Sequence, residues 1–283
     1  MTGNAVHGAI RSIDAAVQPL LILGTRPYAL VVADLVSAIE GYRVAGFVEN
    51  MDRQRCNERL GGMPIYWIDE LAELAQDHVA VCSLATTRRN QFIQQARDQG
   101  LRFATLVHPS AHISDRSTLG EGTRVEVGSI IAAFTDVGRH VAINRGATIG
   151  HHNRIGDFVT IHPGVNIAGH CRIGDRTFIG IGANIIDGIR IGTQAVIGAG
   201  AVVAKDVPDR VQVVGVPARI VKQNIEGNYG ATCGQTDHQR GHHRHGAHET
   251  GQPGGADHRG RDRRRRPALL RRRRQPRPRP RTR

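Results

Sequence analysis

Two adjacent histidines, His151 and His152, stand in a glycine-rich stretch, and the pair Gly169-His170 follows eighteen residues later. An imidazole changes charge close to neutral pH, so it can act as a general base, and it is also a common ligand of Zn²⁺. An exposed glycine backbone can offer its N–H to a reacting oxygen. The chemistry open to these residues is therefore proton transfer, metal binding or both.

A six-residue repeat defines the elements that must position these residues. From Val107 to Val203 every sixth residue is aliphatic, without one insertion. A period of six matches neither the α-helix nor the coiled coil, whereas hexapeptide repeats are typical of parallel β-helices. Three hexads close one triangular coil, so we predict a left-handed parallel β-helix of five to six coils over residues 107–224.

Each hexad also indicates which side chains fill the core. The residue two before the aliphatic one is usually small or β-branched and shares its strand face, so both point inward. The residue three after it lies at a corner, where glycine allows a positive φ. These corner glycines are Gly122, Gly128, Gly146, Gly164, Gly182, Gly188 and Gly200.

The repeat converts sequence spacing into spatial neighbours. Residues eighteen apart occupy the same edge of the prism, about 4.8 Å from one another. This places Gly169 on His151 and His170 on His152, with Asn144 on the neighbouring strand. We expect one edge to gather imidazoles and an exposed glycine backbone.

The remaining chain divides into three regions. Residues 1–18 show no pattern and predict an unstructured arm. Residues 19–106 alternate short apolar runs with helical stretches, which favours a small, parallel, Rossmann-like α/β domain. The strands are expected over 20–23, 44–48, 79–81 and 103–107, and the helices over 27–40 and 87–100.

Residues 225–283 are rich in Arg, His, Gly and Pro and predict a disordered tail. From Glu226 onward sixteen arginines face five acidic residues, a surplus of eleven out of the formal net charge of +13. The body is thus nearly neutral. The tail is either an arginine-rich segment for nucleic acid or an anionic surface, or a dispensable extension. The composition of the tail favours a dispensable extension, so we do not expect nucleic-acid binding.

Cysteine usage and apolar runs bear on the compartment. Cys56, Cys82, Cys171 and Cys233 show no disulfide-like or metal-like spacing, which fits a reducing compartment. No secretory leader pattern and no apolar stretch of membrane-spanning length is evident. The expected location is the cytoplasm.

A zinc site is the first alternative for a histidine cluster. Carbonic anhydrases with hexapeptide repeats bind zinc through histidines shared between subunits, and their paired histidines are five residues apart. Asp157 stands five after His152, and Ile167 stands five after His162. The spacing therefore disfavours a metal, and none is expected as a cofactor.

The stretch from Asn144 to Phe158, NRGATIGHHNRIGDF, resembles the core of a bacterial sugar acetyltransferase family. This family includes the sialic-acid O-acetyltransferases and the UDP-N-acetylbacillosamine N-acetyltransferases. The segments GAGAVVAKDVP (198–208) and VGVPAR (214–219) are similar to it as well. The resemblance implies a homotrimer that transfers acetyl from acetyl-CoA to a hydroxyl or amine of a sugar or nucleotide-sugar in surface glycan biosynthesis.

The resemblance also implies roles for single residues. It makes His151 the general base, puts Asn144 near the base, and sets the Gly169 N–H against the thioester oxygen. His152 stands where the family usually has an acid, and it cannot supply a fixed negative charge. Positions that match the acetyl-CoA groove are Thr160, Ile181 and Ala199, and Arg219, Lys205 and Lys222 could meet CoA phosphates.

The loop after the first strand departs from the family pattern. The family's loop is glycine-rich, so that backbone N–H groups reach a phosphate. Here it contains one glycine, Gly24, followed by Thr25, Arg26 and a proline. Arg26 could replace the lost donors, and Glu49 ends the second strand where a ribose-binding acid could sit.

Other functions remain open at this stage. The missing acid after His151 and the altered loop favour a non-catalytic trimeric scaffold or a sugar-nucleotide sensor. Another hexapeptide acyltransferase, acting on serine or using an acyl carrier protein, would share the same repeat. Acetyl transfer to a sugar is nevertheless the function that the residues favour.

Overall fold

The structure is a computed structural model that describes residues 17–86 and 89–225 of the chain. Most of the predicted arm (1–18) and tail (225–283) lies outside the described residues. Within the described part, two kinds of architecture follow one another along the chain, as the repeat analysis predicts.

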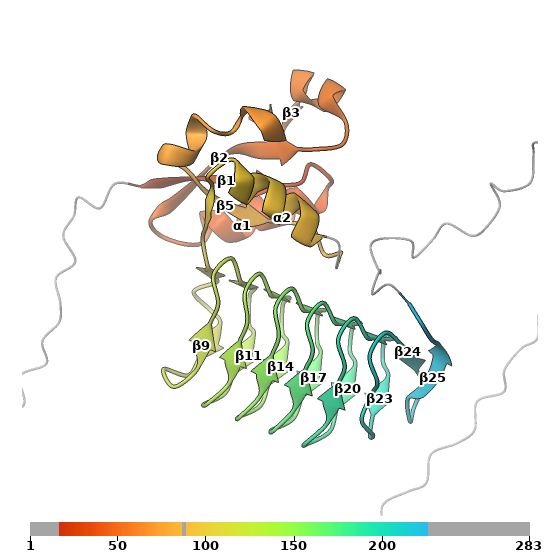
Figure 1. The fold of residues 1–283 in the computed structure, drawn as a ribbon. Helices are drawn as coiled ribbons and strands as arrows, with labels where there is room; N and C mark the ends of the chain where they lie inside the picture. Colours follow the sequence, from red (N-terminus) through yellow and green to blue (C-terminus); the bar gives the residue numbers. More distant parts are fainter. Residues whose placement is uncertain (1–16, 87–88, 226–283) are drawn as a thin grey trace, which may run out of the picture. The chain divides into compact units, whose positions relative to one another are not determined.

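The first is an α/β sheet with short helices (Figure 1). Its elements are β1 (Gln18–Leu23), α1 (Tyr28–Ser37), β2 (Tyr42–Glu49), β3 (Arg59–Leu60), β4 (Met63–Trp67), β5 (Val79–Cys82), α2 (Arg89–Asp98) and β6 (Arg102–Phe103). The strand order is β3-β4-β2-β1-β5-β6. The strands β1, β2 and β5 pair in parallel with fully buried aliphatic side chains, because both faces of the sheet are covered.

The sheet is mixed rather than purely parallel, which corrects the sequence prediction. The short strands β3 and β4 form an antiparallel hairpin around Gly61 and Gly62, both with positive φ, and this hairpin was not predicted. The strand expected over 103–107 is divided. β6 belongs to this sheet, whereas β7 (Leu106–Val107) belongs to the following architecture. Three 3₁₀ turns complete this part (Arg53–Asn57, Ile68–Glu70, Leu74–Gln76).

The second architecture is a prism of stacked coils, and its three sides are flat sheets, which we call faces 1, 2 and 3. Face 1 contains β7, β10 (Arg124–Val125), β13 (Ala142–Ile143), β16 (Thr160–Ile161), β19 (Phe178–Ile179), β22 (Val196–Ile197), β24 (Gln212–Val214) and β25 (Arg219–Lys222). Face 2 contains β8 (His112–Ile113), β11 (Ile130–Ile131), β14 (Thr148–Ile149), β17 (Asn166–Ile167), β20 (Asn184–Ile185) and β23 (Val202–Val203). Face 3 contains β9 (Thr118–Leu119), β12 (Asp136–Val137), β15 (Arg154–Ile155), β18 (Arg172–Ile173) and β21 (Arg190–Ile191).

The register of these sheets confirms the repeat. Every strand from β7 to β23 ends on the predicted aliphatic residue, and neighbours in a face are eighteen residues apart, as in Ile149↔Ile167. Figure 1 shows β11, β14, β17, β20 and β23 side by side in one row. The aliphatic residues and the small residues before them, such as Ala147 and Ala183, form one buried column. A single coil buries little, so the stack is stabilised by its neighbours.

The corners carry the strained backbone. All seven predicted corner glycines have positive φ, between 64° and 73°. The same corner position holds non-glycine residues elsewhere, among them His140 (φ 54°), His152 (φ 56°) and His170 (φ 56°). We call the turns that lead from face 1 to face 2 edge A, and those from face 2 to face 3 edge B.

The last coil ends in a reversal of the chain. After β24 the segment Gly215–Ala218 turns, and β25 pairs with β24 in antiparallel orientation. All four residues of β25 are exposed, and its two ends are Arg219 and Lys222.

A buried arginine joins α2 to the coils. Arg89 is 2% exposed and donates to the backbone oxygens of His140 and Val159 and to the Thr160 hydroxyl at 2.7–3.3 Å. Burial lowers the pKa of Arg89 to about 10, so the guanidinium stays charged at neutral pH. A buried charge without a carboxylate is tolerated because carbonyl oxygens take up its donors.

His140 makes the stability of the protein depend on pH. It is 4% exposed, stacks on Phe158, and accepts a hydrogen bond from Arg97 through Nε2. Burial, and then the charge of Arg97, lowers its pKa to about 4. Because the unfolded chain takes up a proton near pH 6.5, the contribution of neutral His140 to the free energy of unfolding is complete above that pH. This contribution is lost as the pH falls from 6.5 to 4, by roughly 3 kcal/mol.

We expect urea unfolding at several pH values to show this decline in the free energy of unfolding, and His140→Asn to flatten it. Parallel curves for the two proteins would contradict this assignment.

Candidate active site

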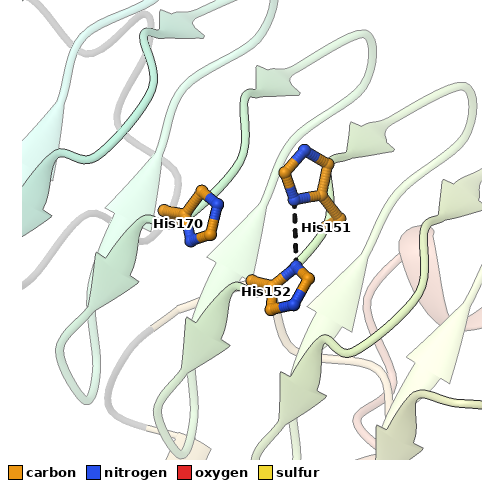
Figure 2. A group of neighbouring side chains, drawn as sticks. All are labelled: His151, His152 and His170. Carbon is orange, nitrogen blue, oxygen red and sulfur yellow. Dashed lines mark hydrogen bonds between the residues drawn. The ribbon is translucent and has the colours of Figure 1, made fainter.

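Edge B holds three imidazoles on two successive coils. His151 and His152 form the turn after β14, and His170 lies in the turn after β17 (Figure 2). The His152 and His170 rings are stacked, with centroids 4.9 Å apart and planes at 21°. The His151 ring stands nearly perpendicular to both, at 88° and 86°. The prediction that residues eighteen apart, such as His152 and His170, lie on one another at this edge is confirmed.

His151 and His152 share a hydrogen bond between their Nδ1 atoms, which are 3.1 Å apart. One of these nitrogens must carry the proton and the other must accept it. If His151 donates, its Nε2 keeps a free lone pair, as a general base requires. A neutral His152 can thus orient the ring and select its tautomer, although it supplies no negative charge.

Gly169 lies against the reactive side of the His151 ring. A Cβ on Gly169 would come within 2.8 Å of His151 Cε1 and 3.0 Å of His151 Nε2, so a side chain there would displace the His151 ring. Among the described residues, no backbone acceptor takes the Gly169 N–H. With the tautomer in which Nε2 keeps its lone pair, this arrangement would suit acyl transfer, since an N–H can bind a developing oxyanion and the lone pair can accept a proton.

Asn144 lies away from this cluster within one chain. It follows β13 at the start of edge A, and the whole of β14 separates it from His151. It is 4% exposed, its amide nitrogen donates to the Ile161 oxygen, and its Oδ1 is 2.7 Å from the Tyr28 hydroxyl. Asn144 and His151 therefore belong to opposite sides of face 2.

The residues predicted to bind acetyl-CoA lie in three places. Ile181 and Ala199 are exposed at edge A. Arg219 is exposed on β25. Thr160 is fully buried on face 1, where its hydroxyl accepts from Arg89 and donates to the Ala85 oxygen at 3.2 Å. In this single chain Thr160 is a structural contact, and its role toward acetyl-CoA stays a prediction.

The loop after β1 is closed by its own contacts. Gly24 has φ 111° and packs so closely on Ser83 that a Cβ would lie 2.5 Å from the Ser83 hydroxyl. Thr25 donates to Glu49 and accepts from Arg55 at 2.6 Å. Arg26 is exposed at the carboxyl end of β1, where ligands of such sheets bind.

Glu49 is 8% exposed, and its oxygens are occupied by Thr25 and by the backbone N–H groups of Asn50 and Met51. Burial alone would raise its pKa, but these hydrogen bonds hold the pKa of Glu49 below its ordinary value. The carboxylate therefore orders the loop, and its predicted contact with a ribose stays a prediction.

A groove on face 3 begins directly after the histidine turn. Its volume is about 680 Å³, and Arg154, Arg172 and Arg190 stack along it at one strand spacing. Asp206 pairs with Arg190 at 3.0 Å. This ladder was not predicted, although an arginine at every eighteenth residue is visible in the repeat.

A parallel β-helix built of hexapeptide coils is the fold of the hexapeptide class of acyltransferases. The family model "Bacterial transferase hexapeptide (six repeats)" matches residues 170–205. No curated protein sequence matches the chain significantly.

Solved structures share both architectures of the chain. A perosamine N-acetyltransferase from Caulobacter crescentus, crystallised with CoA and GDP-perosamine, is 32% identical with a TM-score of 0.67 and covers 74% of this chain and 99% of its own. The acetyltransferase domain of PglB from Neisseria gonorrhoeae is 29% identical, with a TM-score of 0.66, over 72% of this chain and all of its own. WeeI from Acinetobacter baumannii is 26% identical, with a TM-score of 0.65, over 72% and 100%.

The chain belongs to the bacterial hexapeptide transferases, among the sugar acetyltransferases, and its coils form a left-handed β-helix. It is an acyltransferase enzyme. In the described residues, neither helix is long and apolar enough to cross a lipid bilayer.

Proposed function

We propose that the protein transfers an acetyl group from acetyl-CoA to the amino group of a nucleotide-linked amino sugar, with His151 as the general base. The observation that carries the proposal is that the His151 ring lies over Gly169, whose N–H has no backbone acceptor in the described part of the chain. The PglB acetyltransferase domain was crystallised with acetyl-CoA, and the perosamine N-acetyltransferase with CoA and its nucleotide-sugar, which supports the same pair of substrates here.

In the proposed reaction, the sugar amine attacks the thioester carbonyl carbon while His151 Nε2 takes a proton from the nitrogen. The carbonyl oxygen becomes an oxyanion and meets the Gly169 N–H. The C–S bond then breaks, the CoA thiolate leaves, and a proton restores the thiol. The products are the N-acetylated sugar nucleotide and CoA.

A threefold assembly around face 2 supports this reaction. In the coils from Val107 to Val203, every large apolar residue that is exposed lies on face 2 or on one of its two edges; these are Val127, Ile130, Phe134, Ile181 and Ile186. Exposed apolar side chains gathered on one face and its edges favour an interface there. With face 2 toward the axis, edge A of one subunit meets edge B of the next.

This assembly would bring the separated site residues together. His151 and Gly169 come from edge B of one subunit, and Asn144, Ile181 and Ala199 from edge A of its neighbour. Face 3 of the first subunit would form one wall of the cleft between them. The arginine ladder Arg154, Arg172 and Arg190 would then face the phosphates of CoA, in addition to the predicted Arg219.

The nucleotide-sugar acceptor would bind at the α/β sheet. The loop at the carboxyl end of β1 is ordered by Glu49 and leaves Arg26 exposed toward solvent, which suits a diphosphate. Because acetyl-CoA and nucleotide-sugars are both cytoplasmic metabolites, we place the reaction in the cytoplasm. The likeness to sugar N-acetyltransferases favours this acceptor over serine or an acyl carrier protein.

The proposal predicts acetyl-CoA-dependent turnover with an amino-sugar nucleotide. With GDP-perosamine as the probe we expect release of one CoA thiol and gain of one acetyl group per sugar, measured with a thiol reagent and by mass spectrometry. The same nucleotide already N-acetylated, and serine, should give no turnover, because they lack the free sugar amine. Transfer to serine, or none to any GDP- or UDP-linked amino sugar, would contradict the proposal.

A further inference from the structure

The three imidazoles of edge B form a donor set for a transition-metal ion. His151, His152 and His170 are all exposed, and each offers a ring nitrogen that lies within 4.8 Å of the others. Two nitrogens bound to one tetrahedral Zn²⁺ lie about 3.3 Å apart, and the Nδ1 atoms of His151 and His152 are 3.1 Å apart. A small rotation of the exposed His170 ring would complete the set.

The backbone holds these ligands in place. His152 and His170 occupy the same corner position of successive coils, each with φ 56°, so their stacked rings rise from one rigid edge. The turns are tied to each other, since the His170 N–H donates to the His151 oxygen at 2.9 Å. Asp187 on the following coil places a carboxylate against Gly169, which adds negative charge near the cluster. Three neutral nitrogens with an open fourth position are a common zinc environment.

We propose that His151, His152 and His170 together bind a divalent transition-metal ion such as Zn²⁺, and that this ion switches off acetyl transfer. Paired histidines five residues apart, as in the carbonic anhydrases, do not occur at this edge; its histidines are adjacent or eighteen and nineteen residues apart. They meet only because one coil stacks on the next.

Zn²⁺ binding and general-base catalysis both require the His151 ring, so they exclude each other. Zn²⁺ takes the place of the proton that the two Nδ1 atoms share, so His151 must carry its proton on Nε2. Nε2 is the atom that faces Gly169, and once protonated it accepts no proton from the amine. The inhibition rests on the proposed function, whereas the binding does not.

Zinc binding is tested on the full chain by equilibrium dialysis against Zn²⁺ alone, with metal counted by atomic emission. We expect the wild type to bind one more ion per chain than His170→Asn, which keeps a residue that tolerates positive φ. His78→Asn, in the α/β part, should match the wild type. Histidines between residues 238 and 258 contribute equally to all three proteins.

Transfer is then measured across the same Zn²⁺ concentrations. We expect the wild type to lose activity as the extra ion binds, and His170→Asn to need at least about tenfold more Zn²⁺ for the same fractional loss, each protein being compared with its own metal-free activity. Equal metal content in the three proteins, or full wild-type activity with the ion bound, would overturn the inference. If no metal-free protein transfers acetyl, the proposed function fails, and the dialysis alone decides the binding site.

Discussion

Replacing His151 with alanine is expected to lower kcat for acetyl transfer by about 10²- to 10⁴-fold, the range that a general base contributes. The side chain is exposed and its φ is not positive, so alanine fits the turn without strain. The loss should therefore appear in steady-state transfer kinetics, with the thermal unfolding midpoint unchanged.

His78→Ala is the matched control, because it removes an imidazole from the α/β part, where Nδ1 contacts only the Leu74 oxygen among the described residues. It should keep full activity. A fully active His151→Ala would remove this histidine from the mechanism and leave the free Gly169 N–H without a partner base.

The second large effect concerns face 2. Ile130→Asp puts a charge on the outer side of face 2, where an interface would have to bury it unpaired. We expect the variant to be monomeric in analytical ultracentrifugation, while the wild type sediments as a trimer. Its transfer activity should fall as low as that of His151→Ala, because edge A of the neighbour is lost.

Ile220→Asp is a close control for this experiment. Ile130 and Ile220 are both 45% exposed, but Ile220 lies on β25, away from face 2. It should remain trimeric and active. A wild-type monomer that transfers acetyl would show that each chain carries a complete site by itself, and an Ile130→Asp trimer would show that face 2 is not the interface.

The coils could be predicted almost residue by residue because their period is strict. A step of six decides which side chain is buried, and a step of eighteen decides which residues are neighbours, so the stacking of His170 on His152 followed from counting. Glycine at a corner is a local requirement for positive φ, and it too is visible in the sequence.

Contacts between unrelated segments could not be predicted in this way. Nothing in the repeat indicates that Tyr28 covers Asn144 or that Arg89 reaches Thr160, because no period relates α1 or α2 to the coils. The shared proton between His151 and His152 depends on ring orientation, which the residue spacing leaves open. The β3–β4 hairpin was missed, although the pair Gly61-Gly62 between its strands is a turn signal.

The reversal of the chain at β25 bears on whether one molecule can add to the end of another. A parallel coil ends in a row of unpaired backbone groups, which could accept a further coil from another molecule and so start a filament. Here the molecule's own last strand, flanked by Arg219 and Lys222, occupies that position in the opposite direction. On face 1 the end of the described coils is thus covered by an antiparallel strand, which disfavours the addition of a further parallel coil on this face.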